Sequence, residues 1–157
     1  MGAGLYLHVP FCRRKCPYCN FYSVPAQPEL LAAYTAAVCR NLRHYGNAAQ
    51  PERVDTVYFG GGTPSLLLPA QIAQILETAA EQFALSADAE ITLEANPATV
   101  TPEQLRELRH AGINRLSLGV QSLSDAQLKP PNVTRTQTYF GITFWITIVG
   151  GALQALL

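Results

Sequence analysis

Apolar residues along this chain follow two spacings, one typical of strands and one typical of helices. Continuous or alternating apolar runs predict strands at residues 5–9, 54–59, 90–94 and 115–120. Between the first two strands, apolar residues every three or four positions predict a helix over about residues 29–45. A second apolar stripe at helical spacing consists of Ile72, Ile75, Leu76, Ala79 and Phe83. Strands that alternate with helices favour parallel pairing, so we predict an α/β fold with a barrel-like sheet.

Capping residues predict two further helices. Thr101 and Gln104 form a capping-box pattern, and Gly112 is typical of the residue that ends such a helix. A similar pattern predicts a helix that begins at Ser124 and stops at the two prolines of residues 130–131.

The last part of the chain has a different character. It has no charged residue from 136 to 157, and residues 139–157 are almost continuously apolar over nearly the length of a membrane span. We therefore predict a core of residues 1–129 and a divergent tail of residues 130–157. The tail is open to three interpretations: a membrane anchor, a buried helix and strand of a shortened fold, or an out-of-frame or foreign sequence joined to a truncated gene. We favour the last, because no linker composition precedes the break.

If the chain is incomplete in this way, about half of a barrel of strand–helix units is absent. The last parallel strand is then expected to be an unpaired edge.

Composition and charge narrow the class of protein. Eleven basic and eleven acidic residues give a net charge of zero, which does not favour nucleic-acid binding. The first residues do not resemble a secretory signal. We expect a cytoplasmic protein whose cysteines act as ligands rather than bridges, with membrane association through residues 139–157 as an alternative.

Three cysteines, Cys12, Cys16 and Cys19, follow the first predicted strand. Three thiolates on one loop can each bind one iron of a [4Fe–4S] cluster and leave the fourth iron open to another ligand. The three cations of residues 13–15 favour deprotonated thiols and offset the negative charge of such a cluster. The loop therefore favours an anionic iron–sulfur cluster.

Other interpretations of the cysteines are weaker. His8 could complete a zinc site, but it lies in an apolar run that predicts a buried strand and a hydrogen-bonded core histidine. A disulfide scaffold is disfavoured because three cysteines cannot pair evenly. Cys39 falls within a predicted helix and is expected to be a small packed side chain. His44 and His110 also fall on predicted helices and are expected to be solvated.

Glycines and polar residues follow the next three strands. Because the carboxyl ends of parallel strands meet on one rim, we expect these residues to lie beside the cysteine loop. Gly61, Gly62 and Thr63 would let the backbone approach a ligand closely. Glu94 can accept hydrogen bonds from an ammonium group or a ribose hydroxyl, and Gln121 can both donate and accept.

The combined motifs resemble a known family. Cys-x3-Cys-x2-Cys is similar to the cluster loop of radical S-adenosylmethionine (SAM) enzymes. Gly-Gly-Gly-Thr-Pro, Glu-Ala-Asn-Pro and Gly-Val-Gln-Ser, at successive strand ends, resemble the branch of oxygen-independent coproporphyrinogen III oxidases and HemW-like haem chaperones. The resemblance covers about residues 4–129 and implies the N-terminal part of a partial (β/α) TIM barrel. It further implies a cluster bound by the three cysteines, SAM bound at the rim, and cofactor contacts from Tyr6 and Tyr18, for which core packing is the alternative.

Within this branch, one position favours haem binding and transfer over decarboxylation of coproporphyrinogen. The oxidase is expected to carry a further cysteine two residues after the third ligand, where this chain has Phe21. The resemblance thus implies a haem chaperone that also cleaves SAM reductively; the alternatives are an oxygen-independent coproporphyrinogen III oxidase or an inactive fragment. The implied partners are haem or porphyrin, an electron donor such as a flavodoxin, and haem-accepting proteins. The family's cofactor-contacting arginine would fall near Val133, and Arg135 is close but out of pattern.

Overall fold

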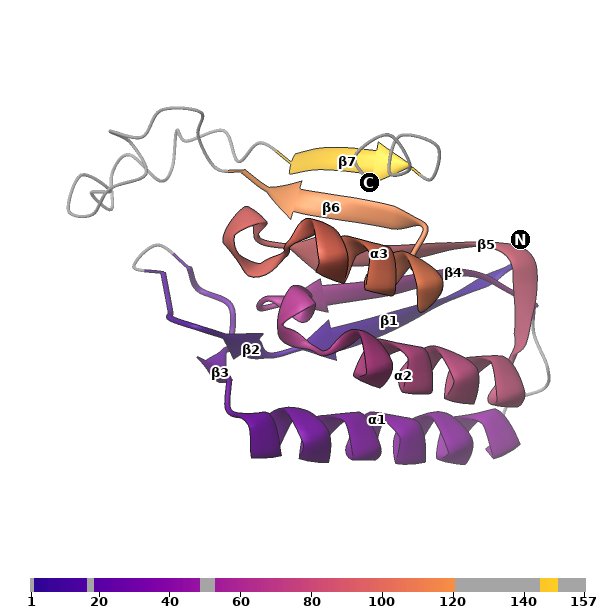
Figure 1. Cartoon of the computed structure of the whole chain (residues 1–157). Helices are drawn as coiled ribbons and strands as arrows, with labels where there is room; N and C mark the ends of the chain where they lie inside the picture. Colours follow the sequence, from indigo (N-terminus) through magenta and orange to yellow (C-terminus); the bar gives the residue numbers. More distant parts are fainter. Residues whose placement is uncertain (1, 17–18, 49–52, 121–144, 150–157) are drawn as a thin grey trace.

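The structure, a computed structural model, describes residues 2–16, 19–48, 53–120 and 145–149. The described part contains a five-stranded sheet in the order β1-β4-β5-β6-β7 and a small two-stranded sheet, β2-β3 (Figure 1). The strands are β1 (Ala3–Val9), β2 (Phe11–Cys12), β3 (Val24–Pro25), β4 (Arg53–Gly61), β5 (Ala84–Ala95), β6 (Arg115–Gly119) and β7 (Trp145–Val149). The helices are α1 (Pro28–Ala48), α2 (Pro69–Gln82) and α3 (Pro102–His110), with the 3-10 turns η1 (Pro64–Leu66) and η2 (Pro97–Thr99).

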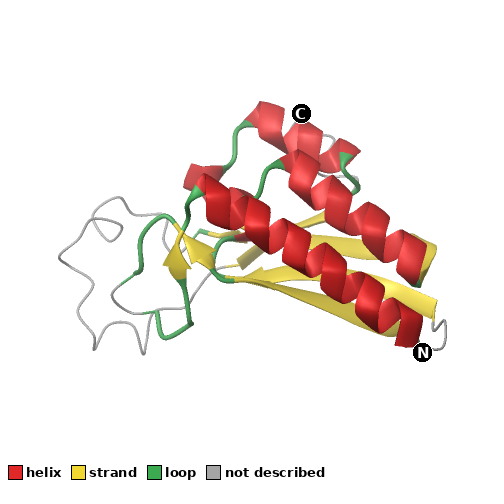
Figure 2. Ribbon diagram, turned by 90° about the horizontal axis from the view of Figure 1, so that it is seen from below, coloured by secondary structure: helices red, strands yellow, loops and turns green. Residues whose placement is uncertain are grey.

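The main sheet has the arrangement of a barrel wall. β1, β4, β5 and β6 pair in parallel in the order in which they occur along the chain. The three helices lie on one face of the sheet, as the view from below shows (Figure 2). A doubly wound sheet carries helices on both faces and reverses its strand order, whereas a barrel wall does neither. The predicted α/β class, with parallel strands alternating with helices, is confirmed.

The hydrophobic core lies between the sheet and the helices. Val57 and Phe59 alternate along β4 and are 1% and 0% exposed. The strand register places Phe59 beside Leu93, and Leu93 beside Leu116, so one apolar layer crosses three strands. Ile75 of α2 packs into the same core. Full burial of each such side chain contributes about 1.5–3 kcal/mol, which explains why the apolar periodicity located these elements.

The opposite face of the sheet is polar. Tyr6, 60% exposed, lies next to Tyr58 with ring centroids 6.0 Å apart, so Tyr6 is not the core residue of the alternative interpretation. His8 is also exposed, and its Nδ1 lies 3.1 Å from the Tyr6 hydroxyl. The prediction of a hydrogen-bonded core histidine was therefore wrong about burial, because His8 points to the face without helices.

The structure corrects one prediction about the last parallel strand. β7 pairs antiparallel with β6, so β6 is not the unpaired edge that we predicted. Among the helices that the structure describes, none is both long and apolar enough to cross a membrane. The rest of the tail, and the helix expected from Ser124, lie outside the described residues.

The predicted capping box begins α3. Thr101 Oγ1 accepts a hydrogen bond from Gln104 N at 3.3 Å, and Gln104 Oε1 accepts one from Thr101 N at 3.0 Å. Thr101→Ala is expected to lower the free energy of unfolding by about 1 kcal/mol, measured by chemical denaturation. Thr101→Ser keeps the acceptor oxygen and should stay close to the wild-type value. Equal losses in the two variants would show that the hydroxyl is not the cause.

Candidate cofactor site

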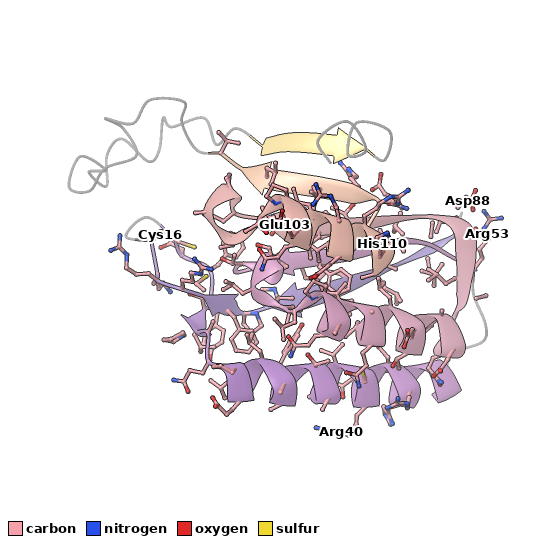
Figure 3. The ribbon with its side chains drawn as sticks, in the orientation of Figure 1. Cys16, Arg40, Arg53, Asp88, Glu103 and His110 are labelled. Carbon is pink, nitrogen blue, oxygen red and sulfur yellow. The ribbon has the colours of Figure 1, made fainter. Side chains whose placement is uncertain are left out.

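An open cavity of about 920 Å³ lies at the carboxyl ends of the parallel strands. Eight of the predicted site residues line it: Tyr6, Cys12, Cys16, Cys19, Gly61, Gly62, Thr63 and Glu94. Figure 3 shows Cys16 at this end of the sheet, with Arg53 and Asp88 at the opposite end. Two other predicted residues, Tyr18 and Gln121, lie outside the described residues, as do Val133 and Arg135.

The three cysteines of the loop are held in different ways. Cys12 ends β2, and its carbonyl accepts a hydrogen bond from Ala26 N at 3.0 Å. The Cys12 Sγ also accepts one from Thr63 Oγ1 at 3.7 Å. Further along the loop, Cys19 N donates a hydrogen bond to Cys16 O at 3.0 Å. All three are free thiols, and Cys16 is exposed at the cavity.

The donor set at the cavity is three thiols, those of Cys12, Cys16 and Cys19. Among the described residues, no three His, Cys, Asp or Glu side chains gather closely enough to hold one metal ion. Zinc draws four ligands to within about 2.3 Å of a single atom, whereas each cysteine of a cluster binds a different iron. Three thiols that line one cavity are a donor set that suits three irons of a [4Fe–4S] cluster.

Cations surround these thiols and brace the loop. Arg13, Arg14 and Lys15 line the cavity together with the cysteines. Arg13 Nη1 donates to Ala98 O at 3.4 Å, which ties the loop to η2, and Lys15 Nζ donates to Phe21 O at 3.0 Å. Positive charge that lines the cavity offsets the negative charge of a bound cluster.

Residues 61–63, the glycine loop, are hydrogen-bonded to the segment that leads to Cys12. Gly62 N donates to Val9 O at 2.8 Å, and Thr63 N donates to Phe11 O at 2.7 Å. A Cβ at Gly62 would lie 2.6 Å from Phe11 O, and Gly61 has a φ of +116°. The glycines therefore allow a close approach of one backbone to another, while the loop still lines the cavity.

Glu94, at the end of β5, faces the cavity as predicted. Its Oε1 accepts a hydrogen bond from the Tyr58 hydroxyl at 2.7 Å, and its Oε2 accepts one from Gly61 N at 3.2 Å. Both donors come from β4. The carboxylate is half-buried and oriented, with acceptor capacity left for a ligand.

A buried hydrogen bond between two side chains, which we did not predict from the sequence, joins η1 to η2. The hydroxyl oxygens of Ser65 and Thr99 lie 2.5 Å apart and are buried. Thr99 donates its hydroxyl proton to Asn96 O at 2.7 Å, so Ser65 donates to Thr99. Isolated serine and threonine residues give no pattern from which such a contact could be predicted.

Three residues that we did not expect at the site, His44, His110 and Cys39, do not line the cavity. His44 on α1 and His110 at the end of α3 are exposed, as predicted. Cys39 is 2% exposed within α1, with its Sγ 3.9 Å from Gln74 O. The prediction of a small packed side chain is confirmed.

Comparisons with known families and proteins show what the sequence of this chain is similar to. The model of the radical SAM superfamily matches residues 6–140. The heme chaperone HemW of Escherichia coli K12 is 42% identical over 127 residues, which are 80% of this chain and 34% of that protein. The mitochondrial radical S-adenosyl methionine domain-containing protein 1 of Mus musculus is 41% identical over 127 residues, 81% of this chain and 29% of that protein. The chain thus spans about a third of the length of these relatives.

A solved structure gives the same result. The radical SAM enzyme coproporphyrinogen III oxidase (HemN) of Escherichia coli superposes with a TM-score of 0.73 at 33% identity, over 80% of this chain and 29% of that one. The match confirms the predicted fold class, the N-terminal part of a partial β/α barrel. From its sequence match, its fold and the residues around its cavity, the chain belongs to the radical SAM superfamily.

Proposed function

We propose that this chain forms part of a HemW-like haem chaperone that holds a [4Fe–4S] cluster at Cys12, Cys16 and Cys19. The observation that supports the proposal best is the meeting of three free thiols and an oriented carboxylate, Glu94, in one cavity. The identity of 42% to the Escherichia coli heme chaperone supports the choice within the superfamily.

The residues of the chain bind and orient the cofactors in this proposal. Glu94 accepts hydrogen bonds from the ammonium group or the ribose hydroxyls of SAM. Gly61, Gly62 and Thr63 shape the wall beside it, and Tyr6 and Tyr18 contact the cofactor through their rings. Gln121 contributes a further donor and acceptor. When bound, the cluster supplies the electron for reductive cleavage of the SAM sulfonium, and the surrounding protein keeps water away from the radical.

Haem is the second ligand that we propose. Phe21 lines the cavity at the position where the oxidase is expected to carry a further cysteine. Phenylalanine at this position favours binding and transfer of haem over decarboxylation of coproporphyrinogen. We propose that this haem transfer takes place in the cytoplasm. The chain would then receive electrons from a donor such as a flavodoxin and pass haem to acceptor proteins.

Anaerobic reconstitution with iron and sulfide tests the proposal. We expect the reduced protein to give the electron paramagnetic resonance signal of a [4Fe–4S] cluster, and this signal to shift when SAM is added. Haem added to the reconstituted protein should give a saturable change in the haem absorbance. A protein without a cluster, or with a cluster signal that ignores SAM, would contradict the proposal, and decarboxylation of coproporphyrinogen would favour the oxidase.

A further inference from the structure

The carboxylate of Glu94 is held by one donor on each oxygen. The Tyr58 hydroxyl binds Oε1 at 2.7 Å, and Gly61 N binds Oε2 at 3.2 Å. A carboxylate offers about four acceptor sites, so these two contacts fix its plane and leave about two sites for a ligand in the cavity. The main-chain donor is present whatever the residue, whereas the second donor depends on one side chain.

Neighbouring residues hold the Tyr58 ring in place. Tyr6 packs against it, with the ring centroids 6.0 Å apart and the planes inclined by 25°. A Cβ at Gly60 would lie 2.8 Å from Tyr58 Cε1, so the first glycine of the triple-glycine run leaves room for this ring. The contact with Tyr6 and the space left by Gly60 therefore let the Tyr58 hydroxyl reach Glu94.

The Tyr58 hydroxyl also keeps its proton. Burial, followed by the hydrogen bond and the negative charge of Glu94, raises the pKa of Tyr58 to about 12. At neutral pH the phenol is protonated and donates to the carboxylate. A carboxylate that is already oriented loses less side-chain freedom when a ligand binds.

We propose that Tyr58 is a positioning residue, which orients Glu94 for the ammonium or ribose hydroxyl groups of SAM. The proposal rests on the SAM-binding role of Glu94 given above. Tyr58 does not line the cavity, so we expect its contribution to disappear when Glu94 can no longer act.

The test measures the dissociation constant for SAM by calorimetry on the full chain, after anaerobic reconstitution of its cluster. Tyr58→Phe should weaken SAM binding roughly ten-fold, as expected for loss of one hydrogen bond to a charged group, with unchanged iron content. Tyr34→Phe is the matched control, because the Tyr34 hydroxyl also donates at 2.7 Å, but to His8 O. This control should bind SAM as the wild type does.

Variants of Glu94 separate the inference from the proposed function. Glu94→Gln should weaken SAM binding. Adding Tyr58→Phe to Glu94→Gln should raise the dissociation constant for SAM by less than about two-fold more, because the two residues act as one unit. Glu94→Asp keeps the charge but withdraws the carboxylate from both Tyr58 and SAM, so it should lose more affinity than Tyr58→Phe. An affinity of Glu94→Asp equal to that of the wild type would contradict the need for an oriented carboxylate.

Two results would count against these roles, in different ways. Wild-type affinity in Glu94→Gln would overturn the role of Glu94 in binding SAM, and with it that part of the proposed function. Weak binding in Glu94→Gln, together with wild-type affinity in Tyr58→Phe or additive losses in the double variant, would overturn the positioning role of Tyr58 alone.

Discussion

Cys16→Ala is expected to abolish cluster assembly and to leave the fold intact. Cys16 is exposed at the cavity, and substitutions at exposed positions usually change the free energy of unfolding by less than about 0.5 kcal/mol. Loss of an outer partner of a metal ligand already costs about 10–100-fold in affinity, so loss of a ligand should cost at least as much. Iron and sulfide content after anaerobic reconstitution should fall at least about ten-fold.

Cys39→Ala provides the control for this experiment. Cys39 is 2% exposed and packs within α1, away from the cavity. Its replacement should lower the free energy of unfolding by roughly 1 kcal/mol and leave the iron content unchanged. If Cys16→Ala retained the full cluster, or if both variants lost it equally, the loop could not be the cluster site.

Gly62→Ala should have the largest effect on stability among the single substitutions that we consider. The new Cβ would lie 2.6 Å from Phe11 O and 3.0 Å from Val9 O, and these backbone atoms cannot turn away. Overpacking of this kind costs about 3 kcal/mol, which corresponds to a melting temperature lower by roughly 10 °C. Cluster content should fall as well, because the displaced segment leads directly to Cys12.

Gly4→Ala is the matched control for Gly62→Ala. A Cβ at Gly4 would meet Thr56 Oγ1 at 2.7 Å, and the nearest backbone atom, Thr56 O, is 3.9 Å away. A threonine hydroxyl can rotate to another rotamer, so the melting temperature should change little. If the two alanine variants melted at the same temperature, backbone crowding at Gly62 would not explain its glycine.

The main elements could be predicted because burial imposes a period on the sequence. Val57 and Phe59 alternate with polar neighbours along β4, and Ile72 and Ile75 follow the helical period of α2. The arrangement of the site could be predicted for a related reason, since parallel strands end on the same rim. This is why the cysteine loop, the glycine loop and Glu94 line one cavity.

Features that depend on distant partners could not be predicted. β5 begins at Ala84 rather than at residue 90, because pairing with Arg53 and Val54 keeps a segment of low strand propensity extended. The antiparallel pairing of β7 with β6 likewise depends on contacts between residues far apart in the sequence. Tyr58 could have been found, since its alternation with Val57 and Phe59 places it on the polar face, but its bond to Glu94 needs the register of two strands.

The contacts that restrain Cys12 reduce the conformational freedom that cluster binding must remove. Strand pairing, the Ala26 amide and the Thr63 hydroxyl already restrain Cys12 before any ligand arrives. Fixing the backbone of one residue costs about 1–2 kcal/mol, and at Cys12 this cost belongs to folding. Iron binding therefore does not have to remove this freedom at Cys12, which acts as a preorganised first ligand.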